Sequence, residues 1–208
     1  MRETVRAARE RGVTIGAHVS YPDIPGFGRR ELGLDASEIA HHVRQQIESF
    51  RKVCAAENAS ARYVKPHGAL YNRAARDPDA AAAVAGAISD CDPELTLLGL
   101  AQSEMARAAP NAGIRFASEA FVDRAYSAQL RLVPRDEPGA LIEDIEEAVK
   151  RAVVLVKRKI MTTSDGIVLP LAAESLCVHG DAGNALELVR ALRAGLEASG
   201  TRVAPFAA

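Results

Sequence analysis

Short apolar runs alternate with longer stretches of helical periodicity along this chain, and no other feature of the sequence constrains its fold as strongly. The runs that predict strands are 13–18, 62–65, 95–100, 114–118, 175–178 and 201–205. The stretches that predict helices are 3–11, the long segment after Asp35, 78–90, 103–109, 140–158 and 183–199. Strands and helices in alternation form a parallel sheet with helices outside it, either open or closed into a barrel. The sequence therefore predicts an α/β fold, in a single domain over residues 1–208.

Three of these elements carry clear end signals, at Asp35 with Glu38, Asp77 with Pro78, and Asp165 with Gly166. The first pair is typical of a capping box, and the second is typical of an N-cap followed by a first-turn proline. The third pair predicts a hairpin turn between the runs 160–163 and 167–171. One element is out of order, because the helix at 3–11 has no strand before it from which to cross over. We therefore expect the natural domain to begin upstream of Met1.

The composition excludes several classes of protein. With 26 basic and 27 acidic residues, the chain lacks the basic excess of a protein that binds nucleic acids or membrane surfaces. No apolar run approaches the roughly 20 residues that span a bilayer, and the N-terminus has no signal-peptide pattern. Cys54, Cys91 and Cys177 have neither the paired spacing of a zinc site nor the density of a disulfide scaffold. We expect free thiols, a cytoplasmic location, and no nucleic-acid or membrane partner.

Reactive side chains gather where the predicted strands end, at the edge of the sheet where parallel α/β folds place their active sites. Three of the five histidines, His18, His67 and His179, belong to this set, whereas His41 and His42 lie in the long helix. The other members are Tyr21, Gly28, Arg29, Arg30, Lys65, Asn72, Glu119, Asp123, Arg124 and Asp181. A lone histidine after a strand is usually structural, but so many reactive groups at one edge predict a single functional site.

Two kinds of ligand can be considered for this edge. The GFGRR segment, residues 26–30, combines glycines that let a backbone approach an anion with arginines that can grip phosphate or carboxylate. The alternative is a surface turn with solvated charge, and the lack of a P-loop or of G-x-G-x-x-G makes the nucleotide signal weak. The three histidines with Asp181 could in principle bind zinc, yet none stands in a His-x-x-x-His pair. No tightly bound metal is therefore expected.

Five strings of residues, in this order, resemble the motifs of the LamB/YcsF lactam-utilisation family. They are GAHVSYPD at 16–23, GFGRR at 26–30, VKPHGALYN at 64–72, E-x-F-x-D-R-x-Y at 119–126 and CVHGD at 177–181. The resemblance implies a TIM-like (β/α) barrel of the glycoside hydrolase and deacetylase type, with that superfamily's link to carbohydrate metabolism. It also implies the A subunit of an ATP-dependent 5-oxoprolinase, which opens 5-oxoproline to L-glutamate together with B and C subunits.

Two further motifs of the family, D-L-N-x-D-x-G-E and N-x-x-C-G-x-H-x-G-D, usually precede the opening helix and do not occur in this chain. We therefore expect a barrel that lacks its first strand or strands. Such a barrel has an open edge with unpaired backbone groups, so this form is expected to associate, for example as a homodimer. Smaller departures from the family pattern are Val19, Val122, Ala128-Gln129 and Ala182-Gly183.

The implied reaction assigns roles to the predicted site. A lactam is a resonance-stabilised amide, and ATP, with Mg²⁺ as its counter-ion, would make its carbonyl a better electrophile by phosphorylating the oxygen. We expect His67 or Glu119 as the general base and Lys65 with the arginines as anion binders. The expected catalytic set is His18, Lys65, His67, Glu119 and Asp181. The expected substrate- or nucleotide-binding set is Tyr21, Gly28, Arg29, Arg30, Asn72, Asp123, Arg124 and His179.

Two alternatives from other functional classes stay open at this point. One is a metal-dependent, deacetylase-like hydrolase that acts on a carbohydrate or an amide, which the superfamily and the histidines favour. The other is a non-catalytic subunit that lends a binding surface to partner enzymes, which the missing first strands favour.

Overall fold

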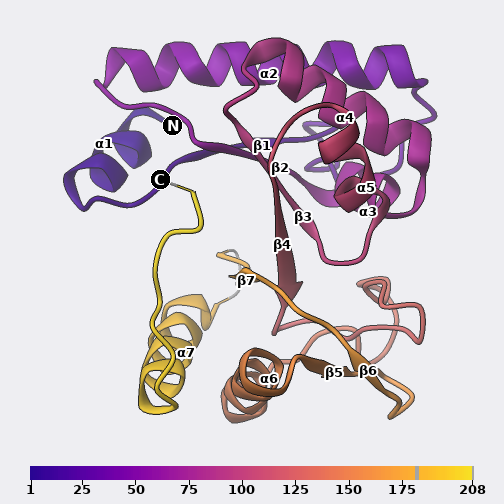
Figure 1. Cartoon of the computed structure of the whole chain (residues 1–208), viewed down its shortest axis with the longest axis vertical. Coiled ribbons are helices and arrows are strands. Elements are labelled where there is room, and N and C mark those ends of the chain that lie inside the picture. The colour runs from indigo at the N-terminus through magenta and orange to yellow at the C-terminus, as the bar shows by residue number, and fades with distance from the viewer. Residues whose placement is uncertain (181–182, 208) are drawn as a thin grey trace. The chain divides into compact units, whose positions relative to one another are not determined.

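The computed structural model describes residues 1–180 and 183–207 as an α/β fold with one parallel sheet (Figure 1). The five strands of this sheet follow the order β1-β2-β3-β4-β7, and β5 pairs with β6 separately. The strands are β1 (Gly16–Val19), β2 (Tyr63–Pro66), β3 (Thr96–Leu100), β4 (Phe116–Phe121), β5 (Ile160–Thr162), β6 (Val168–Pro170) and β7 (Ser175–Cys177). The helices are α1 (Arg2–Glu10), α2 (Ala36–Ala56), α3 (Gly68–Arg76), α4 (Pro78–Cys91), α5 (Glu104–Asn111), α6 (Ile145–Arg158) and α7 (Ala185–Ala198). The predicted α/β class is confirmed.

The chain divides into two compact units. Unit 1 comprises Met1–Ala117 with Pro205–Ala208, and unit 2 comprises Ser118–Ala204. Strand β4 begins in unit 1 at Phe116 and ends in unit 2 at Phe121. Each unit has buried apolar residues of its own and its own group of reactive side chains.

In unit 1, parallel pairing joins β1 to β2 and β2 to β3. Helix α2 contacts β1 and lies beside α4, while α3 lies against β2 and β3 (Figure 1). Strand β3 is buried at every position, as a strand covered on both faces requires. The apolar run 95–100 is therefore confirmed as an inner strand.

Helix α2 forms where the sequence predicts it because its start and its buried face are both specified locally. The Asp35 side chain accepts a hydrogen bond from the Glu38 backbone N–H, and the Glu38 side chain accepts one from the Asp35 N–H. Ile39, Val43 and Ile47 then follow at intervals of four and are buried. Each such side chain contributes about 1.5–3 kcal/mol by leaving water, which is enough to orient the helix on the sheet.

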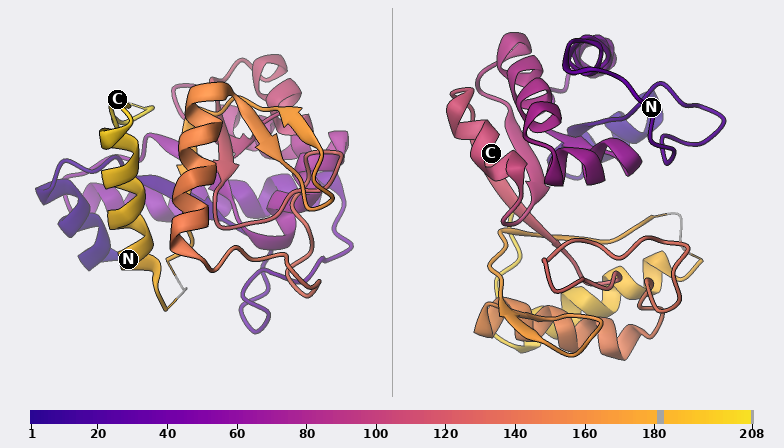
Figure 2. Two further views of the ribbon diagram at one scale, coloured as in Figure 1. Left: turned by 90° about the horizontal axis from the view of Figure 1, so that it is seen from below. Right: turned by 90° about the vertical axis from the view of Figure 1, so that its right-hand side faces the viewer.

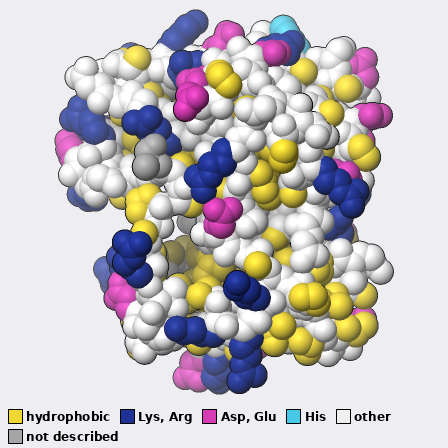
Figure 3. Space-filling view, viewed as in Figure 1, with side chains coloured by type: hydrophobic (Ala, Val, Ile, Leu, Met, Phe, Trp, Pro, Cys, Tyr) yellow, Lys and Arg dark blue, Asp and Glu magenta, His cyan; other side chains and the backbone are white. Residues whose placement is uncertain are grey.

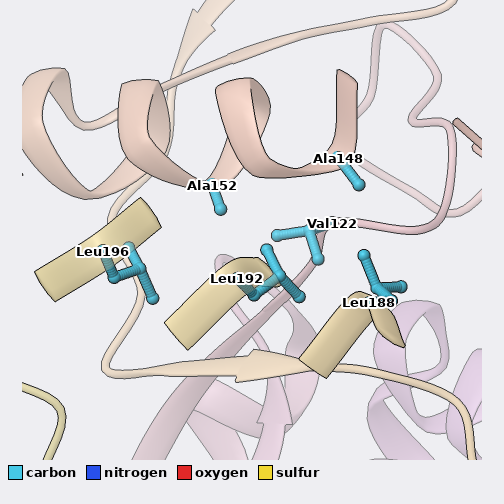
Figure 4. Packing of buried hydrophobic residues seen from close by; sticks show 6 residues of the cluster. All are labelled: Val122, Ala148, Ala152, Leu188, Leu192 and Leu196. Atoms are coloured by element: carbon cyan, nitrogen blue, oxygen red, sulfur yellow. The ribbon is translucent and has the colours of Figure 1, made fainter. Parts of the chain in front are cut away.

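Unit 2 is built on helices α6 and α7, which lie side by side (Figure 2). The core between them consists of Val122, Ala148, Ala152, Leu188, Leu192 and Leu196 (Figure 4). Because the alanines of α6 are small, the leucine row of α7 can approach that helix closely. Strand β4 pairs in parallel with β7, and β5 pairs with β6 in the predicted antiparallel hairpin.

Several boundaries differ from the predicted ones. Strand β4 continues to Phe121, so Glu119 lies within the strand and not after it. Helix α6 begins at Ile145 and not at 140, because the Asp144 side chain caps it by accepting from the Glu147 N–H. Strand β1 begins only at Gly16, residues 201–205 form no strand, and the sequence did not predict α3.

The surface and the thiols agree with the composition. Charged side chains of both signs are interspersed on the face in Figure 3, in keeping with 26 basic and 27 acidic residues. Cys54, Cys91 and Cys177 are free thiols, as expected. Among the helices of the described residues, none combines the length and the apolar character needed to cross a membrane.

Candidate functional site

The first group of reactive side chains lies in unit 1, where β1 and β2 end. The parallel register places His18 opposite Lys65, so both side chains stand on the same face of the sheet. His67 follows β2 directly, and its backbone N–H donates to the carbonyl of Val19 at 2.7 Å. The rings of His18 and His67 meet edge to face, with their centroids 4.7 Å apart. Two neighbouring strand ends thus bring His18, Lys65 and His67 together.

The segment from Asp23 to Arg30 forms a tight loop beside this group. The Asp23 carboxylate accepts hydrogen bonds from the Gly26 backbone N–H at 3.0 Å and from Nε of Arg30 at 3.0 Å. The hydrogen bond from Arg30 holds the pKa of Asp23 below its ordinary value. A side chain at Gly26 would overlap the Asp23 carboxylate, so this ion pair requires glycine there. The loop is therefore closed by its own ion pair.

Glycines let this loop dock onto the start of α3. The Ala69 N–H donates to the Gly28 carbonyl at 2.9 Å. Gly28 and Gly68 both have positive φ angles, 67° and 60°, which disfavour other residues. A Cβ atom at Gly68 would overlap the Gly28 carbonyl oxygen. The close backbone approach that Gly28 allows is thus made by the start of α3 in the same chain.

The docked loop presents the carbonyl of Phe27 to His67. Phe27 has a φ of 54°, a left-handed conformation that costs a non-glycine residue about 1–2 kcal/mol. Nε2 of His67 lies 2.9 Å from the Phe27 carbonyl oxygen. Because a carbonyl oxygen only accepts, Nε2 carries the proton in the neutral ring, and His67 gains a further proton at Nδ1. The loop thereby sets the tautomer of His67.

Lys65 and Arg29 are the cations of this group. Nζ of Lys65 lies 5.9 Å from the centroid of the Tyr71 ring. Arg29 is exposed, and its guanidinium lies over the Phe27 ring at 5.2 Å. Such cation–π contacts orient a charged group. A cation beside two imidazoles can stabilise developing negative charge while a proton moves.

Other members of the expected binding set have structural contacts. Tyr21 is buried, and its hydroxyl accepts a hydrogen bond from Arg73 at 3.3 Å. Arg73 also pairs at 2.9 Å with Asp77, the N-cap of α4, and this hydrogen bond lowers the pKa of Asp77. The charge of Arg30 is paired inside its own loop. These contacts give Tyr21 and Arg30 structural roles, Asn72 is exposed on α3, and the binding roles expected of all three stay predictions.

The second group lies in unit 2 around His179, which follows β7. Nδ1 of His179 lies 2.7 Å from Oδ2 of Asp123, and the backbone N–H of His179 donates to the same oxygen at 3.2 Å. Burial raises the pKa of Asp123, but the hydrogen bond and the charge of His179 outweigh it, so the pKa lies below its ordinary value. The carboxylate is therefore ionised at neutral pH, and Nδ1 of His179 carries the proton that it accepts. Proton exchange at His179 then uses Nε2.

A buried arginine holds the loop that follows β4. The Arg124 guanidinium donates to the carbonyls of Val133 at 2.5 Å and Ala140 at 3.4 Å. Burial, and then the charge of Arg135, lower the pKa of Arg124. Arg124 thus has a structural role, because its N–H groups satisfy main-chain carbonyls inside the protein, and the anion-binding role expected of it stays a prediction.

Asp123 and His179 line a pocket of about 460 Å³ in unit 2. Its wall also includes Arg135, Glu143 and Asn184, none of which belongs to the predicted site. The only sequence signal for the first two is their place in a polar, proline-containing segment between β4 and α6. Their approach to Asp123 depends on how that segment folds back, and residue patterns do not encode this directly.

Two expected catalytic residues have a different status. Glu119 is buried within β4, opposite Ser175 of β7 in the parallel register. Asp181 lies outside the described residues. That all the reactive residues form one site stays a prediction, and so does the expected absence of a bound metal. Within residues 1–180 and 183–207, no group of three or more His, Cys, Asp or Glu is arranged to hold a metal ion.

Comparison with known proteins finds similarity along the whole chain. Residues 1–208 match the family model described as LamB/YcsF family. A protein of Agrobacterium fabrum, named as an A subunit of 5-oxoprolinase, is 43% identical over 204 residues, which are 98% of this chain and 80% of that protein. A protein of Chloroflexus aggregans with the same name is 47% identical over 203 residues, which are 98% of this chain and 81% of that protein.

A solved structure gives the same result for the fold. The crystal structure of the lactam utilization protein from Thermus thermophilus aligns with a TM-score of 0.91 at 41% sequence identity. The alignment covers 99% of this chain and 82% of that chain. Similarity of sequence and similarity of structure therefore extend over the same residues.

Proposed function

Because this chain belongs to the LamB/YcsF family, we propose that it is the A subunit of an ATP-dependent 5-oxoprolinase, which opens 5-oxoproline to L-glutamate. The observation that carries this proposal is the near full-length similarity to proteins named as A subunits of 5-oxoprolinase. The two groups of reactive side chains support it, because opening a lactam requires both proton transfer and stabilisation of negative charge.

The group in unit 1 is suited to the charged part of this reaction. Lys65 and the two imidazoles of His18 and His67 stand at the ends of adjacent strands, on rigid elements that fix their positions. An ammonium group held there can stabilise the negative charge of a phosphoryl group while it is transferred. The Phe27 carbonyl holds Nε2 of His67 and so fixes the orientation of its ring beside His18.

ATP and two further subunits belong to the proposal. ATP, with Mg²⁺ as its counter-ion, would activate the amide carbonyl. The relatives are named as one lettered subunit of an enzyme, which supports a complex with other subunits, here B and C. The proposed location is the cytoplasm, which the free thiols Cys54, Cys91 and Cys177 support. The catalytic residues proposed for the described chain are His18, Lys65, His67 and Glu119.

The test is reconstitution with purified B and C subunits. ATP hydrolysis and glutamate formation are measured with and without 5-oxoproline, and we expect both only when the lactam is present. Lys65→Ala and His67→Ala should each lower glutamate formation about 100-fold. His41→Ala, at an exposed position of α2, is the matched control and should leave the rate unchanged.

Two outcomes would contradict the proposal at different points. ATP turnover that ignores 5-oxoproline in the wild-type complex would reject the function itself. Unchanged rates in both Lys65→Ala and His67→Ala would reject the role of the unit 1 group while leaving the function intact.

A further inference from the structure

The pocket of unit 2 has the size and the lining of a binding site for a small molecule. Its volume of about 460 Å³ falls in the range of roughly 300–1,000 Å³ that is usual for ligand pockets. Three of its wall residues, Leu141, Ile142 and Leu188, are apolar, and they line the same space as the polar Asp123 and His179. In ligand pockets, apolar walls hold a small ring and a few polar groups fix its orientation.

Asp123 and His179 form a dyad suited to proton transfer. The 2.7 Å contact joins Nδ1 of the imidazole to a carboxylate oxygen, so Nδ1 is the donor and Nε2 is the nitrogen that exchanges protons. The additional hydrogen bond from the His179 backbone to the same oxygen fixes the carboxylate relative to the ring. A carboxylate that fixes the tautomer and the orientation of an imidazole is the arrangement of a general base in hydrolases.

The second oxygen of Asp123 indicates that this site is incomplete without a ligand or a water molecule. Oδ1 is buried and has no hydrogen-bond partner among the described residues. Buried acceptors in folded proteins are almost always satisfied, so a donor is expected to reach this oxygen. The N–H of a cyclic amide is such a donor, and so is water.

Arg135 and Glu143 add charges of opposite sign to the wall. The Arg135 guanidinium can bind a carboxylate through two parallel hydrogen bonds. Glu143 can only accept, so it suits an amide N–H or an attacking water. A small ring that carries a carboxylate, an amide N–H and apolar methylenes would meet a matching group on each side.

We propose that this pocket binds a small anionic cyclic amide, with Arg135 holding its carboxylate and His179 acting as the general base. The inference rests on the proposed function, in which that amide is 5-oxoproline. Nε2 of His179 takes a proton from water as the water oxygen bonds to the amide carbonyl carbon. The carbon–nitrogen bond then breaks, and the ring nitrogen receives that proton. Because ATP has phosphorylated the carbonyl oxygen, this leaves an acyl phosphate, which a second water hydrolyses to glutamate and phosphate. Asp123 is a positioning residue for His179.

Binding is tested first on the purified full chain, by NMR of ¹⁵N-labelled histidine side chains. The His179 signals, assigned by their loss in His179→Gln, should shift when 5-oxoproline is added and much less with pyrrolidin-2-one, the same ring without a carboxylate. Arg135→Gln should weaken 5-oxoproline binding about tenfold, whereas Arg190→Gln, an exposed arginine of α7, should leave it unchanged. No shift at His179, or equal binding of the two lactams, overturns the proposal.

Catalysis is tested next in the complex with B and C subunits. His179→Gln should lower kcat about 100-fold or more with a folded protein. Asp123→Asn should lower kcat and change the ¹⁵N signals of His179 from a single Nδ1–H tautomer to a mixture, because an amide no longer fixes the proton at Nδ1; a merely structural role would leave the tautomer unchanged. Full kcat in His179→Gln overturns this inference while the proposed function stands. A wild-type complex without lactam-dependent turnover rejects the proposed function, and the NMR experiment still decides whether the pocket binds the lactam.

Discussion

Gly68→Ala is the sharpest test of how the loop at residues 23–30 is fastened to the unit 1 site. Gly68 has a φ of 60°, and a Cβ atom there would overlap the Gly28 carbonyl oxygen. That oxygen accepts the hydrogen bond from Ala69 N at 2.9 Å. The loop must therefore move away from α3 if residue 68 gains a side chain.

Two costs add in this variant. An alanine in the left-handed region costs about 1–2 kcal/mol. Loss of the Ala69–Gly28 hydrogen bond costs about 0.5–1.5 kcal/mol more. We therefore expect Gly68→Ala to lower the free energy of unfolding by about 1.5–3.5 kcal/mol. Gly12→Ala is the matched control, because Gly12 has a φ of 62° but no atom within 4 Å of the added Cβ. That control should lose only the first of the two costs, about 1–2 kcal/mol.

Urea unfolding of both variants and of the wild type measures these differences, provided that the slopes are equal. A second readout follows the site itself. When the loop moves, Nε2 of His67 loses the Phe27 carbonyl, so the ¹⁵N signals of its imidazole should report a mixture of tautomers in Gly68→Ala only. Equal destabilisation in the two variants, with an unchanged His67 tautomer, would refute the idea that glycine is required for docking.

Three further predictions concern single interactions. Arg124→Lys should lower the free energy of unfolding by about 1–3 kcal/mol in urea unfolding, because one ammonium cannot serve the carbonyls of Val133 and Ala140 as the guanidinium does. Lys159→Gly should raise the melting temperature, since Lys159 ends α6 with a φ of 56° and glycine relieves about 0.5–1 kcal/mol of strain there. Asp77→Asn keeps the N-cap acceptor of α4 but removes the charge that pairs with Arg73. Because that pairing lowers the pKa of Asp77, its stabilisation is present above about pH 4 and is lost as the pH falls through the folded pKa, so urea unfolding should show a wild-type advantage at about pH 6 that shrinks as the pH falls below about 4.

Much of the fold could be predicted because its signals are local. The capping box at Asp35 and the proline after Asp77 specify where α2 and α4 begin. The hairpin between β5 and β6 needs only its turn residues. Helix α3 could not be predicted in this way, because its first residue is Gly68, a poor helix former that is required there by the neighbouring loop. The start of α6 was predicted too early because the apolar pattern also extends to residues before the Asp144 cap.

The two reactive groups also differ in how much of each could be predicted from local sequence signals. His18 and Lys65 could be placed together from sequence, since adjacent parallel strands bring their ends to one edge. The pairing of Asp123 with His179 also joins two strand ends, those of β4 and β7. Arg135 reaches the unit 2 pocket only because the segment after β4 folds back on itself, which depends on tertiary contacts. Patterns of residue type carry no signal for such contacts.

The arginines show why the type of a residue does not settle its role. Arg30 and Arg124 are bound to Asp23 and to main-chain carbonyls, whereas Arg29 lies over the Phe27 ring and Arg135 lines the unit 2 pocket. An arginine whose ion pair or hydrogen bonds hold a loop together stabilises the site, and an arginine whose guanidinium faces solvent can bind a substrate. Removing the charge of Arg30 or Arg124 should therefore lower stability and activity together. At Arg29 and Arg135, which are exposed, activity should fall without a matching loss of stability. The ratio of the two effects, measured for all four positions, separates the arginines that build the site from those that use it.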